Sequence, residues 1–445
     1  MKRRSHIFNA RGTVAALMVL AASGGMPAYG QELSTRRTAA WRPLRPEQAI
    51  HLEQAVSYAF GSHPKIRAAE ARLREAQGRL TGAQTYPHNP ILSGGAAAHT
   101  IGPDQSRPDL NFVLGQEIEI AAQRGDRISA SQRELAAQRA KLLRTKRLLA
   151  ANVHVAFIAG LETRELLDVA LRDVVLTRRL YELAQRRLER GGATQLDVNV
   201  AAAELGRSEA RFQSAEADYG LARAFLAETI GLDPSFLPLP RGKLHVELEA
   251  PPSLKEAVQS AHGRRADLRA LREQQAASRG RYELAKSEAW PNITLSALAG
   301  SEEGIPLVGG ALSIPIPLFN RNQGRIQETK AGIDRSLAEH ELGELSAQRE
   351  VVAAHTRYQT GIRTAQRLRQ LVVGTLEQNL LLLQRAFDAG KATWPEVVLI
   401  RRSLVDGQRE LISAEANARQ AWIALQIATG RMPVPLPKRK PKEKQ

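Results

Sequence analysis

The sequence predicts a mainly α-helical protein with a small β part, built as two tandem copies of one unit. Three observations lead to this fold class. Several short matches recur in the same order about 200 residues apart. Each copy holds a proline-free stretch that suits a helix of roughly 100 Å. Each also holds segments of about ten residues in which apolar residues alternate with polar or small ones.

The internal repeat sets the predicted domain organisation. The matching segments are 52–56 with 254–258, 66–68 with 268–270, 86–87 with 290–291, 123–125 with 322–324, 190–194 with 389–393, and 230–231 with 429–430. We place the first copy at residues 31–236, a proline-rich linker at 237–252, and the second copy at 253–433. The lysine-rich tail at 434–445 is expected to be disordered.

The first thirty residues have the pattern of a cleaved signal peptide. Basic residues at 2–4 precede an apolar run at 13–22, and the small residues Ala28 and Gly30 stand before Gln31. The apolar run is too short to span a membrane as an anchor. The chain has no cysteine, which excludes disulfides and a lipid anchor on a cysteine.

The formal charge of +17 does not indicate a nucleic-acid-binding protein. Much of it lies in the signal peptide and the tail, and the rest is spread along helices among glutamates. No enzyme motif is present: there is no P-loop, no glycine-rich dinucleotide motif and no HExxH pair. His88, His99 and Asp104 are interpreted as solvated loop residues, so we predict no metal site and no cofactor.

The first long element of each copy leads into a β-like region. A helix is expected at 64–85, because Pro87 follows it, with strands at 91–99 and 110–120. One face of the second strand is apolar, and so is the matching segment of the other copy: Leu110, Phe112, Leu114, Ile118 and Ile120; Val308, Leu312, Ile314, Ile316 and Leu318. This alternation fits a membrane strand with a lipid face and a lumen face. A half-buried strand of a soluble sheet remains an alternative.

The expected very long helices are residues 123–190 and 322–389. Leucine and isoleucine recur in them at the spacing of a coiled-coil seam: Ile128, Leu135, Leu142 and Leu149, then Leu176, Leu180, Leu183 and Leu188. Glycines at 191–192 and 390 mark the turns into the return helices.

Four strands cannot close a barrel, and open edges are not tolerated in lipid. The chain is therefore expected to form an oligomer. A trimer would supply a 12-stranded outer-membrane β-barrel, continued by a periplasmic α-helical barrel. Because the inward residues are small or polar, such a barrel would be a passive duct.

The two units, their element order and their glycine-plus-acid turns resemble the TolC family of outer-membrane efflux proteins, over about residues 47–433. The segment 314–324 is similar to the heavy-metal branch, which exports cobalt, zinc, cadmium or copper cations. The resemblance implies a homotrimer in outer-membrane lipid. It also implies a periplasmic adaptor protein and an inner-membrane transporter, of the RND type in this branch.

The resemblance further implies a periplasmic gate formed by Asp197, Glu396 and Phe387. The family's basic residue after the second turn is replaced here by Ala392, and a second acidic position by Leu399. Helix N-terminal charge is the alternative role for the two carboxylates. The adaptor is expected to contact the turns at Gly191, Thr194, Gly390, Lys391 and Thr393.

Other functions remain open at this point. The duct could serve drugs or other small molecules in place of metal cations. A periplasmic coiled-coil adaptor or scaffold would need one helical hairpin flanked by globular β domains, which the two matching units do not offer. An exported basic protein that binds an anionic polymer would not need paired apolar strand faces.

Overall fold

The computed structural model describes residues 48–100, 106–245, 249–302, 305–388 and 391–431. The predicted signal peptide, the basic tail, Asp104 and Gly390 lie outside the described residues, as does the side chain of His99.

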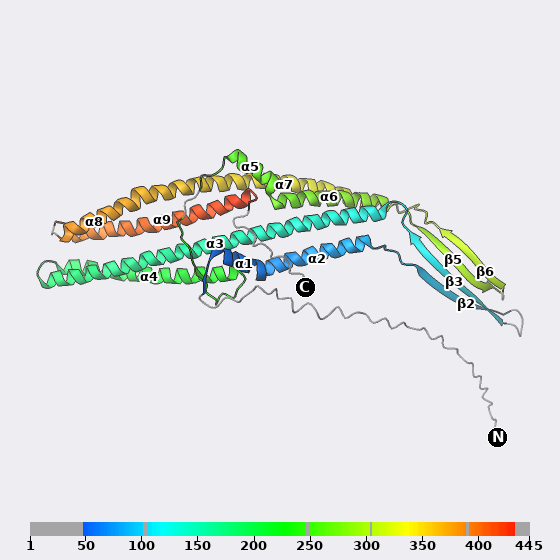
Figure 1. Ribbon diagram of the computed structural model, residues 1–445, viewed down its shortest axis with the longest axis horizontal. Helices are drawn as coiled ribbons and strands as arrows, with labels where there is room; N and C mark the ends of the chain where they lie inside the picture. The colour runs from blue at the N-terminus through cyan, green and yellow to red at the C-terminus, as the bar shows by residue number, and fades with distance from the viewer. Residues whose placement is uncertain (1–47, 101–105, 246–248, 303–304, 389–390, 432–445) are drawn as a thin grey trace, which may run out of the picture. The chain divides into compact units, whose positions relative to one another are not determined.

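The two repeats follow one another with the same order of elements (Figure 1). The first contains α1 (Leu52–Ser62), α2 (Pro64–Gln84), β2 (Ile91–Thr100), β3 (Ser106–Ile118), α3 (Gln123–Glu189) and α4 (Gln195–Thr229). The second contains α5 (Leu254–Arg264), α6 (Ala266–Ser287), β5 (Ile293–Glu302), β6 (Ile305–Ser313), α7 (Gln323–Arg367), the π-helix η1 (Leu368–Val373), α8 (Gly374–Asp388) and α9 (Trp394–Ala428). This confirms the predicted tandem repeat. It adds the short helices α1 and α5, and it shows that the second long helix is interrupted.

Equivalent residues begin and end the helices of the two repeats. Ala122 before α3 and Asn322 before α7 both have left-handed backbones, with φ of 64° and 59°. Gly231 after α4 and Gly430 after α9 also have positive φ, 81° and 75°. A Cβ on Gly430 would lie 2.6 Å from the carbonyl carbon of Arg264, so only glycine lets this helix end approach the α5–α6 junction.

The four longer strands form one antiparallel sheet in the order β2-β3-β5-β6. Phe112 lies opposite Ala299, which lies opposite Val308. Residues opposite each other in a sheet point to the same face. The apolar faces predicted for β3 and β6 are therefore one continuous face, and the other carries small residues such as Ser296 and Ala311. The predicted strands were too long: Ile120 lies beyond the end of β3, and Ile314, Ile316 and Leu318 lie beyond the end of β6 in the proline-containing segment 314–318.

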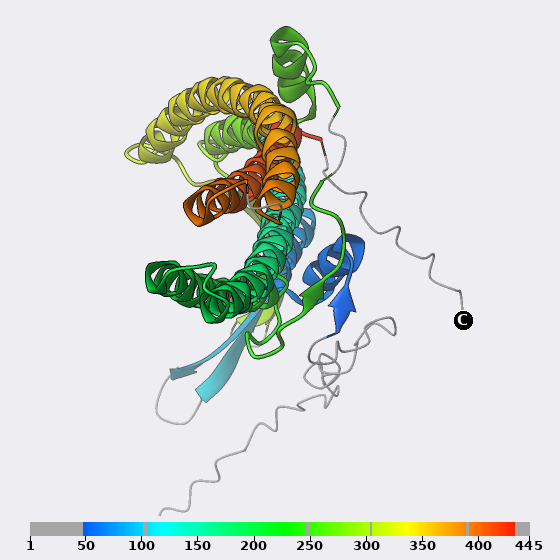
Figure 2. The ribbon, with the colours of Figure 1, turned by 90° about the vertical axis from the view of Figure 1, so that its left-hand side faces the viewer.

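Helix α3 lies among more neighbours than any other helix of the described chain. It packs against α2, α4, α6 and α9, whereas α7 packs mainly against α6 and α9. The short strands β1 (Ala49–Ile50) and β4 (Leu239–Pro240) pair in parallel beside α1 and α3 (Figure 2). Buried residues of α1, α3, α4 and α9 form the largest apolar core.

No helix in the described part of the chain combines the length and the apolar character needed to cross a bilayer.

Candidate functional site

The turn between α3 and α4 is fixed by a reciprocal cap. The amide and hydroxyl of Thr194 both donate to Asp197 Oδ2, each at 2.8 Å. The amide of Asp197 donates to Thr194 Oγ1 at 3.2 Å. The hydrogen bond from the backbone of Thr194, and then that from its hydroxyl, lower the pKa of Asp197. Asp197 is thus held ionised at the start of a helix, where negative charge is favourable.

The second turn repeats this arrangement at the start of α9. The amide and hydroxyl of Thr393 donate to Glu396 Oε2 at 2.7 and 2.8 Å. The same two bonds lower the pKa of Glu396. The structure therefore gives both carboxylates the helix-capping role. Capping places Asp197 and Glu396 at equivalent points of the two hairpin tips. The role of these carboxylates in a gate stays a prediction.

Phe387 is buried inside the protomer. Its ring centre lies 5.6 Å from that of Trp394, and the guanidinium of Arg187 stacks 4.1 Å from the Phe387 centre. Arg187 also donates to the Phe387 carbonyl at 3.2 Å. The ring belongs to an apolar cluster that includes Val198 of α4 and Val397 of α9. This cluster joins the tips of the two hairpins.

The residues predicted to contact an adaptor lie on the surface of the turns. Gly191, Thr194, Lys391 and Thr393 are all exposed, whereas the structure does not describe Gly390. Gly191 has φ 68°, as a glycine at the end of a long helix requires.

A buried ionic network joins the hairpins further from the tips. The Arg401 side chain of α9 is 1% exposed and contacts Asp173 of α3 and Glu204 of α4. Its Nη2 lies 2.6 Å from Glu204 Oε2, and Arg402 Nε donates to the same oxygen at 3.0 Å. Arg211 donates to Asp173 at 3.1 Å. The hydrogen bond from Arg402 is the main cause of the lowered pKa of Glu204.

The sequence contained a signal for this network. Asp173 stands three residues before Leu176, so it occupies a position of the coiled-coil seam that an apolar residue normally fills. A charge at such a position needs a buried partner. The partner could not be named, because Arg401 comes from the other repeat.

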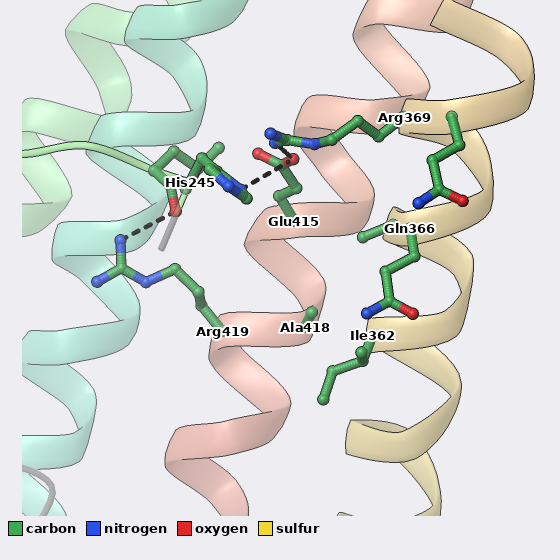
Figure 3. A pocket seen from close by; sticks show the side chains of 10 residues that line it. His245, Ile362, Gln366, Arg369, Glu415, Ala418 and Arg419 are labelled. Carbon is green, nitrogen blue, oxygen red and sulfur yellow. Dashed lines mark hydrogen bonds and ion pairs between the residues drawn. The ribbon is translucent and has the colours of Figure 1, made fainter. Parts of the chain in front are cut away.

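A cavity of about 380 Å³ lies between α7, η1 and α9, next to the linker (Figure 3). The carboxylate of Glu415 contacts Arg369 of the π-helix. His245 Nδ1 lies 3.5 Å from the same carboxylate. Arg419 donates to the carbonyls of Lys243 and Leu244 at 2.7 and 3.1 Å. These contacts fasten the linker across α9.

Among the described residues, no group of three histidine, aspartate, glutamate or cysteine side chains is placed to hold a metal ion. His88 pairs with Glu117 at 3.0 Å and lies 3.3 Å from the Asn292 amide. Its contacts are with the neighbouring strand and the second repeat.

The family model described as "Outer membrane efflux protein" matches residues 55–232 and 257–431. The chain belongs to this family. It is an outer-membrane efflux channel, and its family consists of channel proteins and not of enzymes. The two matched ranges fall in the two repeats.

Individual relatives agree with this assignment. The cobalt-zinc-cadmium resistance protein CzcC of Cupriavidus metallidurans is 25% identical over 397 residues, which cover 87% of this chain and 93% of CzcC. The pyoverdine export outer membrane protein OpmQ of Pseudomonas putida is 24% identical and covers 85% of each chain. The crystal structure of VceC from Vibrio cholerae superimposes with a TM-score of 0.71, at 21% identity, over 85% of this chain and 96% of VceC. The predicted resemblance and fold class are confirmed.

Proposed function

We propose that three copies of this chain form the outer-membrane duct of a tripartite efflux pump, and that heavy-metal cations are its cargo. The sheet carries the main argument. In the order β2-β3-β5-β6, the strands β2 and β6 each have one neighbour within the described chain. Unpaired edges are not stable in lipid, and barrels of this class begin at about eight strands. Three such sheets, joined edge to edge, give twelve strands.

The helical part supports the same assembly. Several large apolar side chains of α7 are exposed in one copy: Leu337, Leu342, Leu345 and Val352. Apolar side chains repeated along one helix need a partner surface. In a trimer, α7 at one side of a copy would pack against the first repeat of the next copy.

A periplasmic adaptor and an inner-membrane transporter of the RND type complete the proposed pump. The adaptor would contact the exposed turns at Gly191, Thr194, Gly390, Lys391 and Thr393. The chain would reach the outer membrane after cleavage before Gln31, without a lipid on cysteine.

The choice of heavy-metal cargo rests on the name and coverage of CzcC. Export of small organic molecules is the second candidate, because OpmQ is named for pyoverdine export. A duct lined by small and polar residues selects weakly, so the transporter would decide between them.

The oligomeric state tests the duct directly. Size-exclusion chromatography with light scattering, on protein extracted in detergent, should give a mass of three chains after subtraction of the detergent. A monomer that stays soluble without detergent would overturn the proposal.

The gate is tested by the variant Asp197→Asn with Glu396→Gln, which keeps the shape of both caps and removes their charge. In planar bilayers we expect lower cation selectivity or a more leaky pore, because the ring of carboxylates at the aperture is lost. Glu216→Gln, an exposed carboxylate on α4, is the matched control. Equal currents in all three proteins would remove Asp197 and Glu396 from the gate.

A further inference from the structure

An apolar groove of about 620 Å³ lies where the sheet meets the helices. It is lined by residues that follow β3, precede β5 and follow β6, among them Ile120, Trp290, Ile314, Ile316 and Arg321. Trp290 is 67% exposed and Ile316 is 77% exposed. Large apolar side chains at such exposure are unfavourable in water, so the groove calls for an apolar occupant.

The groove continues the apolar face of the sheet. Ile293, which lines it, lies opposite Ile118 of β3. By the alternation of the strands, Ile118 is on the same face as Leu114 and Phe112. The face proposed to contact lipid therefore runs without a break into the groove. The groove would lie at the level where the bilayer ends and the helices begin.

A cation stands beside the groove. Arg321 Nε donates to the Pro317 carbonyl at 3.2 Å, which fixes the guanidinium at this position. None of the ion pairs in the described chain involves Arg321, whereas Arg325 lies 3.5 Å from Glu288. An exposed guanidinium without a carboxylate partner is suited to bind a phosphate by two hydrogen bonds.

The first repeat lacks this combination. Counting back from the equivalent residues Ala122 and Asn322, Glu117 and Glu119 stand where the second repeat has Pro317 and Phe319. Glu119 pairs with Arg127 at 2.8 Å, and Glu117 pairs with His88. Where the sheet meets the helices, the first repeat thus has a network of paired charges. At the same place, the second repeat has an open apolar groove beside Arg321, a cation with no carboxylate partner in the described chain.

We propose that this groove binds one phospholipid of the leaflet that faces the periplasm. An acyl chain lies along Ile293, Ile314 and Ile316, Arg321 binds the phosphate, and Trp290 lies at the interface, where its amphipathic ring is favoured. The inference rests on the proposed membrane duct. It assigns one lipid site to each protomer, in the leaflet that faces the periplasm.

Phosphatidylglycerol with brominated acyl chains, added to the detergent-solubilised trimer, tests the site, because bromine quenches tryptophan only at short range. The contribution of Trp290 is the difference between the wild type and Trp290→Phe. We expect this contribution to saturate at about one lipid per protomer. Arg321→Gln should weaken binding about tenfold, and so should a brominated diacylglycerol, which lacks the phosphate.

Arg325→Gln, four residues later and inside α7, is the matched control, and it should bind as the wild type does. Light scattering confirms the trimer before each titration. An intact trimer in which Arg321→Gln and the diacylglycerol quench like the wild type with phosphatidylglycerol would overturn the lipid site alone. A monomer that needs no detergent would overturn both the lipid site and the duct.

Discussion

The long helices of the two repeats, α3 and α7–η1–α8, start from equivalent residues and have different surroundings. Helix α3 is continuous over 67 residues and has α2, α4, α6 and α9 as neighbours. Its counterpart is divided by the π-helix and has fewer neighbours within the protomer. Accordingly, α3 buries residues along most of its length, whereas α7 leaves Leu342 and Leu345 exposed.

This difference shows that two copies of one sequence unit can have different surroundings within the same chain. One long helix lies inside the protomer, and the other lies at its side. A seam position of the inner helix can carry a charge such as Asp173, because helices from both repeats surround it. In the proposed trimer, the exposed apolar residues of the outer helix would contact a neighbouring copy.

The largest loss of stability is expected when the ionic network around Asp173 of α3 is broken. Among the described residues, Arg401 is the one fully buried cation that contacts both Asp173 and Glu204. Arg401→Leu leaves these carboxylates with partly exposed arginines only, such as Arg211 and Arg402, which should lower the free energy of unfolding by about 3–5 kcal/mol. Thermal or urea unfolding in detergent measures it. The matched control is Ala202→Leu, at the exposed equivalent position of the first repeat, which should change little. Similar stabilities for the two variants would contradict the role of the network.

The next largest effect is on the pH dependence of stability. It concerns two buried histidines at nearly equivalent positions, His154 of α3 and His355 of α7. Burial, and then the charge of Arg419, lower the pKa of His154 to about 4. Among the described residues, the Nδ1 of His154 has no hydrogen-bond partner, whereas His355 Nε2 lies 2.9 Å from the Pro252 carbonyl.

Because unfolded His154 binds a proton more readily than the folded side chain, stability should fall as the pH drops from about 6.5 towards 4. The loss should reach roughly 3 kcal/mol. His154→Gln should remove most of this acid sensitivity, as measured by unfolding across that pH range. His355→Gln is the matched control. An unchanged acid dependence in His154→Gln would contradict the prediction.

A smaller effect is expected from two leucine variants, one of which should weaken the trimer and the other the folded protomer. Leu342 of α7 is 64% exposed, and Leu142, at the equivalent position of α3, is half-buried. Leu342→Gln should weaken the trimer by about 1–2 kcal/mol per protomer, with little change in protomer stability. Leu142→Gln should do the reverse. Light scattering at decreasing protein concentration, together with unfolding, distinguishes them. A trimer equally stable in both variants would place α7 outside the interface.

The smallest effect is expected at the two caps. Thr194→Ala and Thr393→Ala each remove a hydroxyl that donates to the carboxylate of the cap, and the hydroxyl of Thr194 also accepts the Asp197 amide. Each variant should weaken the start of its helix by about 1 kcal/mol. Amide hydrogen exchange at residues 195–198 and at Trp394, Glu396 and Val397 measures this locally. Protection unchanged in both variants would show that the caps do not hold the turns.

Periodic features of the sequence predicted most of the fold. The seam leucines located α3 from residue 123 to within one residue of its end, and the alternation in β3 identified the face that the register with β5 confirms. The interruption of the second long helix was not predicted, because residues 368–373 continue a helical pattern without proline or glycine. A π-helix is rare and has no sequence signature comparable to proline, and this one packs against α9.

The candidate site was only partly predictable. The turn residues Thr194, Asp197, Thr393 and Glu396 could be found because caps have a local sequence signature. The place of Phe387 between Arg187 and Trp394 could not, because the contact with Arg187 joins the second repeat to the first.

The edge strands β2 and β6 have a genetic consequence. In a trimer closed by these edges, a copy with a damaged β6 would still offer an intact β2, so it would enter mixed assemblies with normal copies. With equal expression of both forms, about one assembly in eight would contain only normal copies. Damage to β6 should therefore act as a dominant trait, whereas loss of the whole chain should be recessive.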